Sequence, residues 1–178
     1  MSWFQKKAPG SLETPQTGPA PRAPQGLKVG PLLSEDVILF PPAAQGKSAV
    51  LEALTAVVCR KAGLTDPIRF LAKVEERESG ISTTLDTGLS LPHARMDGID
   101  AILAGMAILK TAIPDPKQAD LSIRVVFLFF SPNKPEAFPL HLQLLRGVSS
   151  LFQPALIDQL TAAAGPAEAL ALVRKIEG

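Results

Sequence analysis

The polar segment of residues 77–95 holds residue types that could carry out phosphoryl transfer. It contains His93, one of only two histidines in the chain, with Arg77 and Arg95 on either side of it. A neutral imidazole nitrogen is nucleophilic near pH 7, so a histidine can accept a phosphoryl group and keep it transferable. Arginine presents planar donors that suit phosphate oxygens. A polar loop of this length inside a domain is usually functional, and we expect His93 to be partly exposed in it.

Several motifs in this segment and beyond it resemble those of a known family. They are Arg77-Glu78, Ser82-Thr83, Gly88-Leu89-Ser90-Leu91-Pro92-His93-Ala94 and His141-Leu142-Gln143-Leu144-Leu145. Together they resemble the motifs of the fructose/mannitol-type enzyme IIA domains of the bacterial phosphoenolpyruvate-dependent phosphotransferase system, which include nitrogen-related regulatory members. The resemblance covers residues 31–176.

The resemblance implies a phosphotransferase component with a phosphohistidine intermediate, not a stand-alone metabolic enzyme. It implies that His93 accepts a phosphoryl group from the histidine phosphocarrier protein and passes it to a separate IIB domain. His141 would be the second histidine of the pocket, and Arg77 would offset charge there. Ser82 and Thr83 are further candidates for the phosphate pocket. The resemblance implies no cofactor and no metal.

Three of these residues also fit purely structural roles. His141 shares an apolar helical stripe with Leu145 and Val148, and a lone histidine in such a stripe is more often a core residue. Ser82 and Thr83 could serve a turn or a helix cap instead of a pocket. On the residue pattern alone, these alternatives stay open.

Two positions in the segment depart from the family pattern. Thr84 and Asp86 stand where small glycines are common in the family. They would stiffen the loop, and Asp86 adds a negative charge near the acceptor. We expect these departures to affect phosphorylation strength or partner choice more than the fold.

Two other functions are alternatives. The same phosphorylation could regulate binding to target proteins, with no sugar served downstream. A weaker alternative is a P-loop-like nucleotide binder, because Gly46-Lys47-Ser48 lies between an apolar run and a helix. That motif also needs a glycine where Pro41 stands, so a plain helix start at Lys47 is the favoured interpretation.

The composition excludes several other classes of function and site. Eighteen basic and seventeen acidic residues give a net charge of +1, which argues against a nucleic-acid partner that binds a broad basic surface. No apolar run reaches the roughly 18–20 residues of a membrane span, so we expect a cytoplasmic protein without membrane insertion. A single cysteine, Cys59, excludes a cysteine-rich zinc site.

The elements that must position these residues follow an α/β pattern. The runs 102–109 and 123–130 are nearly continuously apolar, which suits strands buried on both faces. Apolar periodicity and proline starts predict helices, in chain order near Val50, Pro67, Pro139, Pro154 and Pro166. We therefore expect a single mixed β-sheet flanked by helices on both faces.

The first 26 residues differ in composition from the rest. They hold five prolines and only scattered apolar side chains, which cannot offset the entropy of ordering. We expect a disordered, flexible tail over residues 1–26 and the phosphotransfer domain over residues 27–178.

Overall fold

An antiparallel pair of long apolar strands forms the centre of the fold in the computed structural model, which describes residues 27–42 and 45–178. These strands are β4 (Leu103–Pro114) and β5 (Ser122–Pro132). On one side β1 (Ile38–Leu39) pairs parallel with β4. On the other side β2 (Leu89–Ser90) and β3 (His93–Met96) pair parallel with β5, one after the other along its length. The predicted mixed sheet is confirmed, with five strands.

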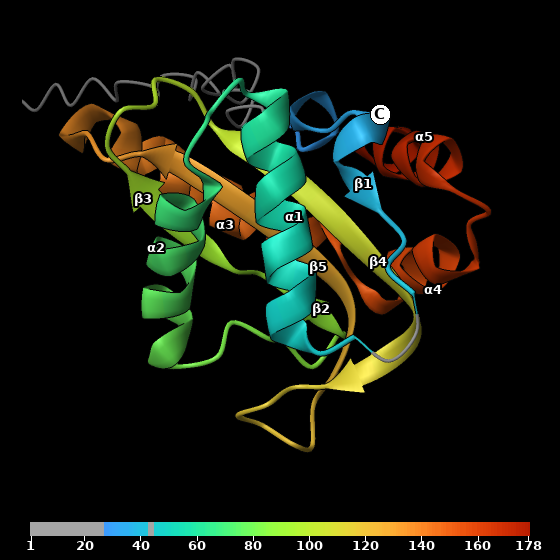
Figure 1. The fold of residues 1–178 in the computed structure, drawn as a ribbon. Coiled ribbons are helices and arrows are strands. Elements are labelled where there is room, and N and C mark those ends of the chain that lie inside the picture. Colours follow the sequence, from blue (N-terminus) through green and yellow to red (C-terminus); the bar gives the residue numbers. More distant parts are fainter. Residues whose placement is uncertain (1–26, 43–44) are drawn as a thin grey trace, which may run out of the picture.

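Helices cover both faces of this sheet (Figure 1). α1 (Lys47–Lys61) and α2 (Pro67–Ser79) lie over one face. α3 (Phe138–Leu151), α4 (Pro154–Ala162) and α5 (Pro166–Glu177) lie over the other. Both faces of the two long strands are therefore buried, which confirms the predicted α/β class.

The side chains of β5 alternate between two apolar layers, because successive residues of a strand point to opposite faces. Phe130 packs edge-on against Phe70 of α2, with ring centroids 5.0 Å apart. Phe127 packs on the opposite face against Phe152, which follows α3, at 5.6 Å. All four rings are buried. Phe129 belongs to the same face as Phe127, and this is the face on which the two histidines lie.

A glycine in β4 allows α1 to approach the sheet closely. A Cβ on Gly105 would lie 2.6 Å from a methyl group of Val58 and 3.0 Å from one of Leu54. Carbon atoms cannot approach so closely without displacing their neighbours. The packing distance between α1 and β4 therefore depends on this glycine.

The polar segment of residues 77–95 is not the continuous loop that its composition predicts. It contains β2 and β3, and a tight turn of residues 85–88 precedes β2, with the Gly88 amide donating to the Leu85 carbonyl at 3.1 Å. Gly88 has φ of 92°, which favours glycine. Both strands join the sheet through backbone hydrogen bonds to β5. Their side chains therefore need not follow the apolar pattern that is typical of a strand.

Parts of the sequence interpretation lie outside the described residues. These are the predicted tail, residues 1–26, and residues 43–44 of the stretch compared with a P-loop. The helix predicted after that stretch is present and begins at Lys47. Across residues 27–42 and 45–178, no helix is both long enough and apolar enough to cross a membrane.

Candidate functional site

A cavity of about 500 Å³ brings three of the five predicted site residues together. His93 comes from β3, His141 from α3 and Arg77 from the last turn of α2. The remaining lining residues are Lys73, Glu76, Ser79, Gly80, Ala94 and Arg95. The cavity thus lies where the edge strand β3 meets a helix from each layer.

His93 is held as a neutral imidazole. Its ring stacks on Phe129 with centroids 5.4 Å apart and an interplanar angle of 13°. Its Nδ1 lies 2.8 Å from the Leu91 carbonyl oxygen, which can only accept, so Nδ1 carries the proton and Nε2 keeps its lone pair. Burial, and then the charge of Arg77, lower the pKa of His93. The residue is only 9% exposed, so the expectation of a partly exposed side chain is wrong: pairing of β3 with β5 draws it into the sheet edge.

His141 is both a buried residue of its helix and a lining residue of the cavity. It is 6% exposed, and its ring centroid lies 5.4 Å from that of His93. Its Nδ1 is 2.7 Å from the Ser131 hydroxyl. Burial, followed by the charges of His93 and Arg95, lowers the pKa of His141 to about 4. The ring is therefore neutral at pH 7. His141 is both a buried residue, as the core interpretation predicts, and a lining residue of the cavity, as the pocket interpretation predicts.

The cavity wall carries positive charge. Lys73 is neutralised by Glu76 at 2.8 Å, one turn along α2. Arg77 donates from Nη1 to the Ile81 carbonyl at 3.2 Å, and Arg95 donates from Nη2 to the Lys134 carbonyl at 2.8 Å. Within residues 27–42 and 45–178, neither arginine is paired with a carboxylate. The two guanidinium groups can therefore attract an anion to the histidines.

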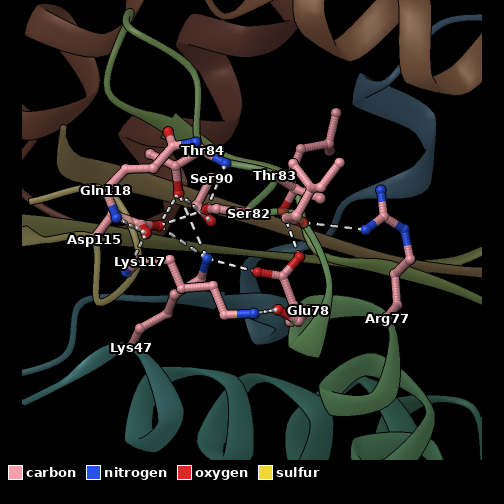
Figure 2. Close-up of polar contacts among 12 residues, drawn as sticks. Lys47, Arg77, Glu78, Ser82, Thr83, Thr84, Ser90, Asp115, Lys117 and Gln118 are labelled. Atoms are coloured by element: carbon pink, nitrogen blue, oxygen red, sulfur yellow. Dashed lines mark hydrogen bonds and ion pairs between the residues drawn. The ribbon is translucent and has the colours of Figure 1, made fainter.

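Ser82 and Thr83, the other two candidates, do not line this cavity. Ser82 donates its hydroxyl to Asp115 Oδ2 at 2.7 Å, and Thr83 donates to Glu78 Oε1 at 2.6 Å. Both residues belong to a buried polar cluster on the far side of the segment from Arg77 (Figure 2). The cluster comprises Lys47, Glu78, Ser82, Thr83, Thr84, Ser90 and Asp115.

Lys47 is the cation of this cluster and is more than a helix start. Its Nζ lies 2.6 Å from Glu78 Oε2 and 3.2 Å from Asp115 Oδ2. Figure 2 draws both contacts as dashed lines. Thr84, one of the two departures from the family pattern, donates its hydroxyl to the same Asp115 oxygen at 2.6 Å. Burial raises the pKa of Asp115, but the hydrogen bonds from Thr84, Ser82 and the Lys117 amide, together with the Lys47 charge, outweigh it and hold that pKa well below its usual range.

The turn between β4 and β5 connects this cluster to the end of α2. Asp115 Oδ1 accepts from the backbone amides of Lys117 and Gln118, at 2.9 and 3.1 Å. The Lys117 ammonium donates to the carbonyl of Glu78 and, at 2.8 Å, to that of Gly80. These are carbonyls at the helix end that lack intrahelical partners, so Lys117 acts as a side-chain cap. The cluster thereby fixes the helix end from which Arg77 projects.

A family model with the description phosphoenolpyruvate-dependent sugar phosphotransferase system, EIIA 2, matches residues 31–176. The chain belongs to this EIIA 2 family. EIIA domains are phosphotransfer components of their system, so a phosphoryl carrier role applies to this chain. A comparison with curated protein sequences finds no match.

Solved structures of EIIA proteins share the fold at low sequence identity. The nitrogen regulatory protein IIA-Ntr from Neisseria meningitidis is 20% identical with a TM-score of 0.71, over 82% of this chain and 98% of that one. Mannitol enzyme IIA from Escherichia coli, in complex with phosphorylated enzyme IIB, is 16% identical with a TM-score of 0.67, over 80% and 97%. The crystal structure of IIA mannitol from Escherichia coli is 17% identical to this chain with a TM-score of 0.63, over 79% of this chain and 98% of that one.

Two residues next to the two histidines are absent from the predicted set. Arg95 is noted only as one of the two arginines that flank His93 and is not among the predicted site residues. Ser131, whose hydroxyl lies 2.7 Å from His141 Nδ1, is not considered at all. Assigning residues 93–96 to a strand would place Arg95 on the same face as His93, two residues away. No local signal identifies Ser131, because its contact with His141 depends on the packing of α3 against β5.

Proposed function

We propose that His93 Nε2 accepts a phosphoryl group from the histidine phosphocarrier protein and passes it to a separate IIB domain. One observation carries this proposal: the Leu91 carbonyl holds the proton on Nδ1 at 2.8 Å, inside a cavity lined by a second histidine and by arginines. The lone pair on Nε2 is then available at neutral pH without a separate base. The lowered pKa of His93 keeps the ring in this neutral form.

The transfer balances without an added acid or base. A bond forms between His93 Nε2 and phosphorus while the bond from phosphorus to the donor histidine breaks. With the donor ring protonated on its other nitrogen, the donor leaves as neutral histidine. The His93 ring keeps its Nδ1 proton, so the product is the protonated phosphohistidine, with the ring proton bonded to Leu91.

The neighbouring side chains stabilise the transferring group. Arg77 contributes a full positive charge to the cavity and favours the negative phosphoryl oxygens. His141 acts as a neutral hydrogen-bond partner, because its pKa of about 4 excludes a charged ring at pH 7. With the Ser131 hydroxyl donating to Nδ1, His141 carries its proton on Nε2 and can donate it to a phosphoryl oxygen.

The test is phosphorylation of the full chain by radiolabelled, phosphorylated phosphocarrier protein. The wild-type chain is expected to gain an acid-labile, base-stable phosphate, as phosphoramidates are, and His93→Gln is expected to gain none. His141→Gln should still be labelled, but should pass the phosphate on about 10- to 150-fold more slowly, the equivalent of one charge-assisted hydrogen bond. A base-labile label, or normal labelling of His93→Gln, would overturn the proposal.

A regulatory function is the second candidate. The structural likeness to nitrogen regulatory IIA-Ntr supports it, and the likeness to mannitol enzyme IIA supports transport in the same way. The phosphorylated chain distinguishes the two. Transfer of label to the cysteine of an added IIB domain indicates the carrier role, whereas retained label together with phosphorylation-dependent binding of a target protein indicates regulation.

A nucleotide-binding function has less structural support. The ammonium group of Lys47, the lysine of Gly46-Lys47-Ser48, is held by two buried carboxylates. A P-loop lysine must instead reach the phosphates of the nucleotide. Titration with ATP is therefore expected to show no saturable binding.

A further inference from the structure

Arg95 occupies a position from which it can reach a group bound to His93. The two residues are separated by one residue in β3, so their side chains lie on the same face of the strand, and both line the cavity. His93 pairs with Phe129 in β5, and Arg95 pairs with Ser131. Since Ser131 bonds to His141, Arg95 is next to the second histidine as well as the first.

The Arg95 guanidinium has unused hydrogen-bonding capacity. It makes no ion pair with a carboxylate in the part of the chain that the structure describes. Its Nε is buried and has no hydrogen-bond partner among these residues. A buried donor left unpartnered is destabilising and calls for an explanation. A phosphoryl oxygen is the acceptor that suits a guanidinium beside a phosphate-accepting histidine.

The orientation of this guanidinium is fixed before any ligand arrives. Its Nη2 donates to the Lys134 carbonyl at 2.8 Å, and its Cζ lies over the Phe138 ring, 5.1 Å from the centroid. Phe138 in turn stacks on His141 at 6.2 Å and 13°. A donor held in this way loses little conformational freedom when it binds an anion.

We propose that Arg95 is a second guanidinium that binds the phosphoryl group on His93, alongside Arg77. This inference rests on the proposed function and specifies the phosphate contacts of that site. The two arginines come from different elements, the end of α2 and the edge strand β3. Each arginine therefore binds the phosphoryl group from its own element, and together they favour the phosphorylated form of the chain. A charge-assisted hydrogen bond of this kind corresponds to about 10- to 150-fold in an equilibrium constant.

The test measures how strongly the chain holds the phosphoryl group. Arg95→Gln, Arg95→Lys and a control, Arg60→Gln, an exposed arginine on α1, are phosphorylated at His93 chemically with phosphoramidate. The partition of the phosphoryl group between each chain and the phosphocarrier protein is then measured, together with the ³¹P NMR signal of the phosphohistidine. Thermal unfolding of each unphosphorylated variant reports any purely structural effect.

Arg95→Gln is expected to shift the partition about 10- to 150-fold towards the phosphocarrier protein and to move the ³¹P signal. Arg95→Lys should recover part of the shift, since lysine restores the charge but not the planar fork. Arg60→Gln should match the wild-type chain. A partition and a ³¹P signal in both Arg95 variants that equal those of the wild type would overturn the proposal.

The chemical donor separates this proposal from the proposed function. If phosphoramidate phosphorylates His93 but the phosphocarrier protein does not, the partner assignment fails. The role of Arg95 is then decided by the hydrolysis half-life of the phosphohistidine, which should be shorter in Arg95→Gln than in Arg60→Gln. Equal half-lives in the two variants would overturn the role of Arg95.

Discussion

Replacing Lys47 by alanine tests whether the buried cluster stabilises the fold. The Lys47 side chain is 7% exposed, and it neutralises the side chains of Glu78 and Asp115, which are 11% and 0% exposed. Removing one partner of a buried ion pair leaves uncompensated charge and is destabilising by about 3–5 kcal/mol. For a domain of this size each kcal/mol corresponds to about 2–4 °C in Tm, so we expect a fall of about 6–20 °C.

The same helix provides a matched control. Lys61 forms an ion pair of similar length with Asp36, at 2.8 Å, but the two side chains are 54% and 55% exposed. An exposed pair contributes about 0–1 kcal/mol, so Lys61→Ala should lower the Tm by no more than about 4 °C. Both variants are measured by thermal and urea unfolding at pH 7.

A third variant separates charge from packing. Lys47→Met combined with Glu78→Gln and Asp115→Asn removes all the charges of the cluster at once. Because neutral groups need no buried counter-charge, this variant should be more stable than Lys47→Met alone. Equal small shifts for Lys47→Ala and Lys61→Ala would refute the reasoning, as would a triple variant less stable than Lys47→Met.

Three further predictions concern titration, packing and the domain boundary. In an NMR titration the His141 ring should show a midpoint near pH 4, and the His93 ring a midpoint below its usual 6.5; a midpoint for His141 at or above 6.5 would contradict its buried placement. The folded pKa of His141 lies below its unfolded value, so its contribution to stability is complete above about pH 6.5 and falls as the pH drops towards 4. Between about pH 4 and 6.5, the unfolding free energy of His141→Gln should therefore depend less on pH than that of the wild-type chain. Gly105→Ala should destabilise the fold by about 1–3 kcal/mol in urea unfolding, whereas Gly165→Ala, whose Cβ would meet nothing within 4 Å, should change it little. Removal of residues 1–26 should leave the Tm nearly unchanged, and a fall of several degrees would place the domain boundary earlier in the chain.

Most of the fold could be predicted because its signals are local. The starts of α2, α4 and α5 have a proline in the first turn, and Asp66 accepts a hydrogen bond from the Arg69 amide at 3.2 Å, as its capping position predicts. The long strands β4 and β5 are recognisable because burial on both faces requires continuously apolar sequence. β2 and β3 escaped prediction, since strands of two and four residues at a sheet edge need only backbone pairing.

The residues of the site and of the buried cluster also fall into those that the sequence could predict and those that it could not. His93, His141 and Arg77 could be named because their motifs are specific, and the structure brings all three to one cavity. The buried cluster could not be predicted, because the ion pair between Lys47 and Asp115 joins residues 68 positions apart in the chain. Only the packing of α1 and α2 against the turn between β4 and β5 brings these groups within bonding distance.

The short strands at the sheet edges also bear on self-association. An unpaired strand edge offers a row of backbone donors and acceptors on which another chain can add, which is a route to aggregation. In the described part of this chain, β1, β2 and β3 form the two edges and have only two to four residues each. Pro92, which has no N–H to donate, interrupts the edge between β2 and β3, and Arg95 adds a charge to it. The strand that carries His93 can therefore stay at an open edge, where a partner protein can approach, without serving as a template for a growing sheet.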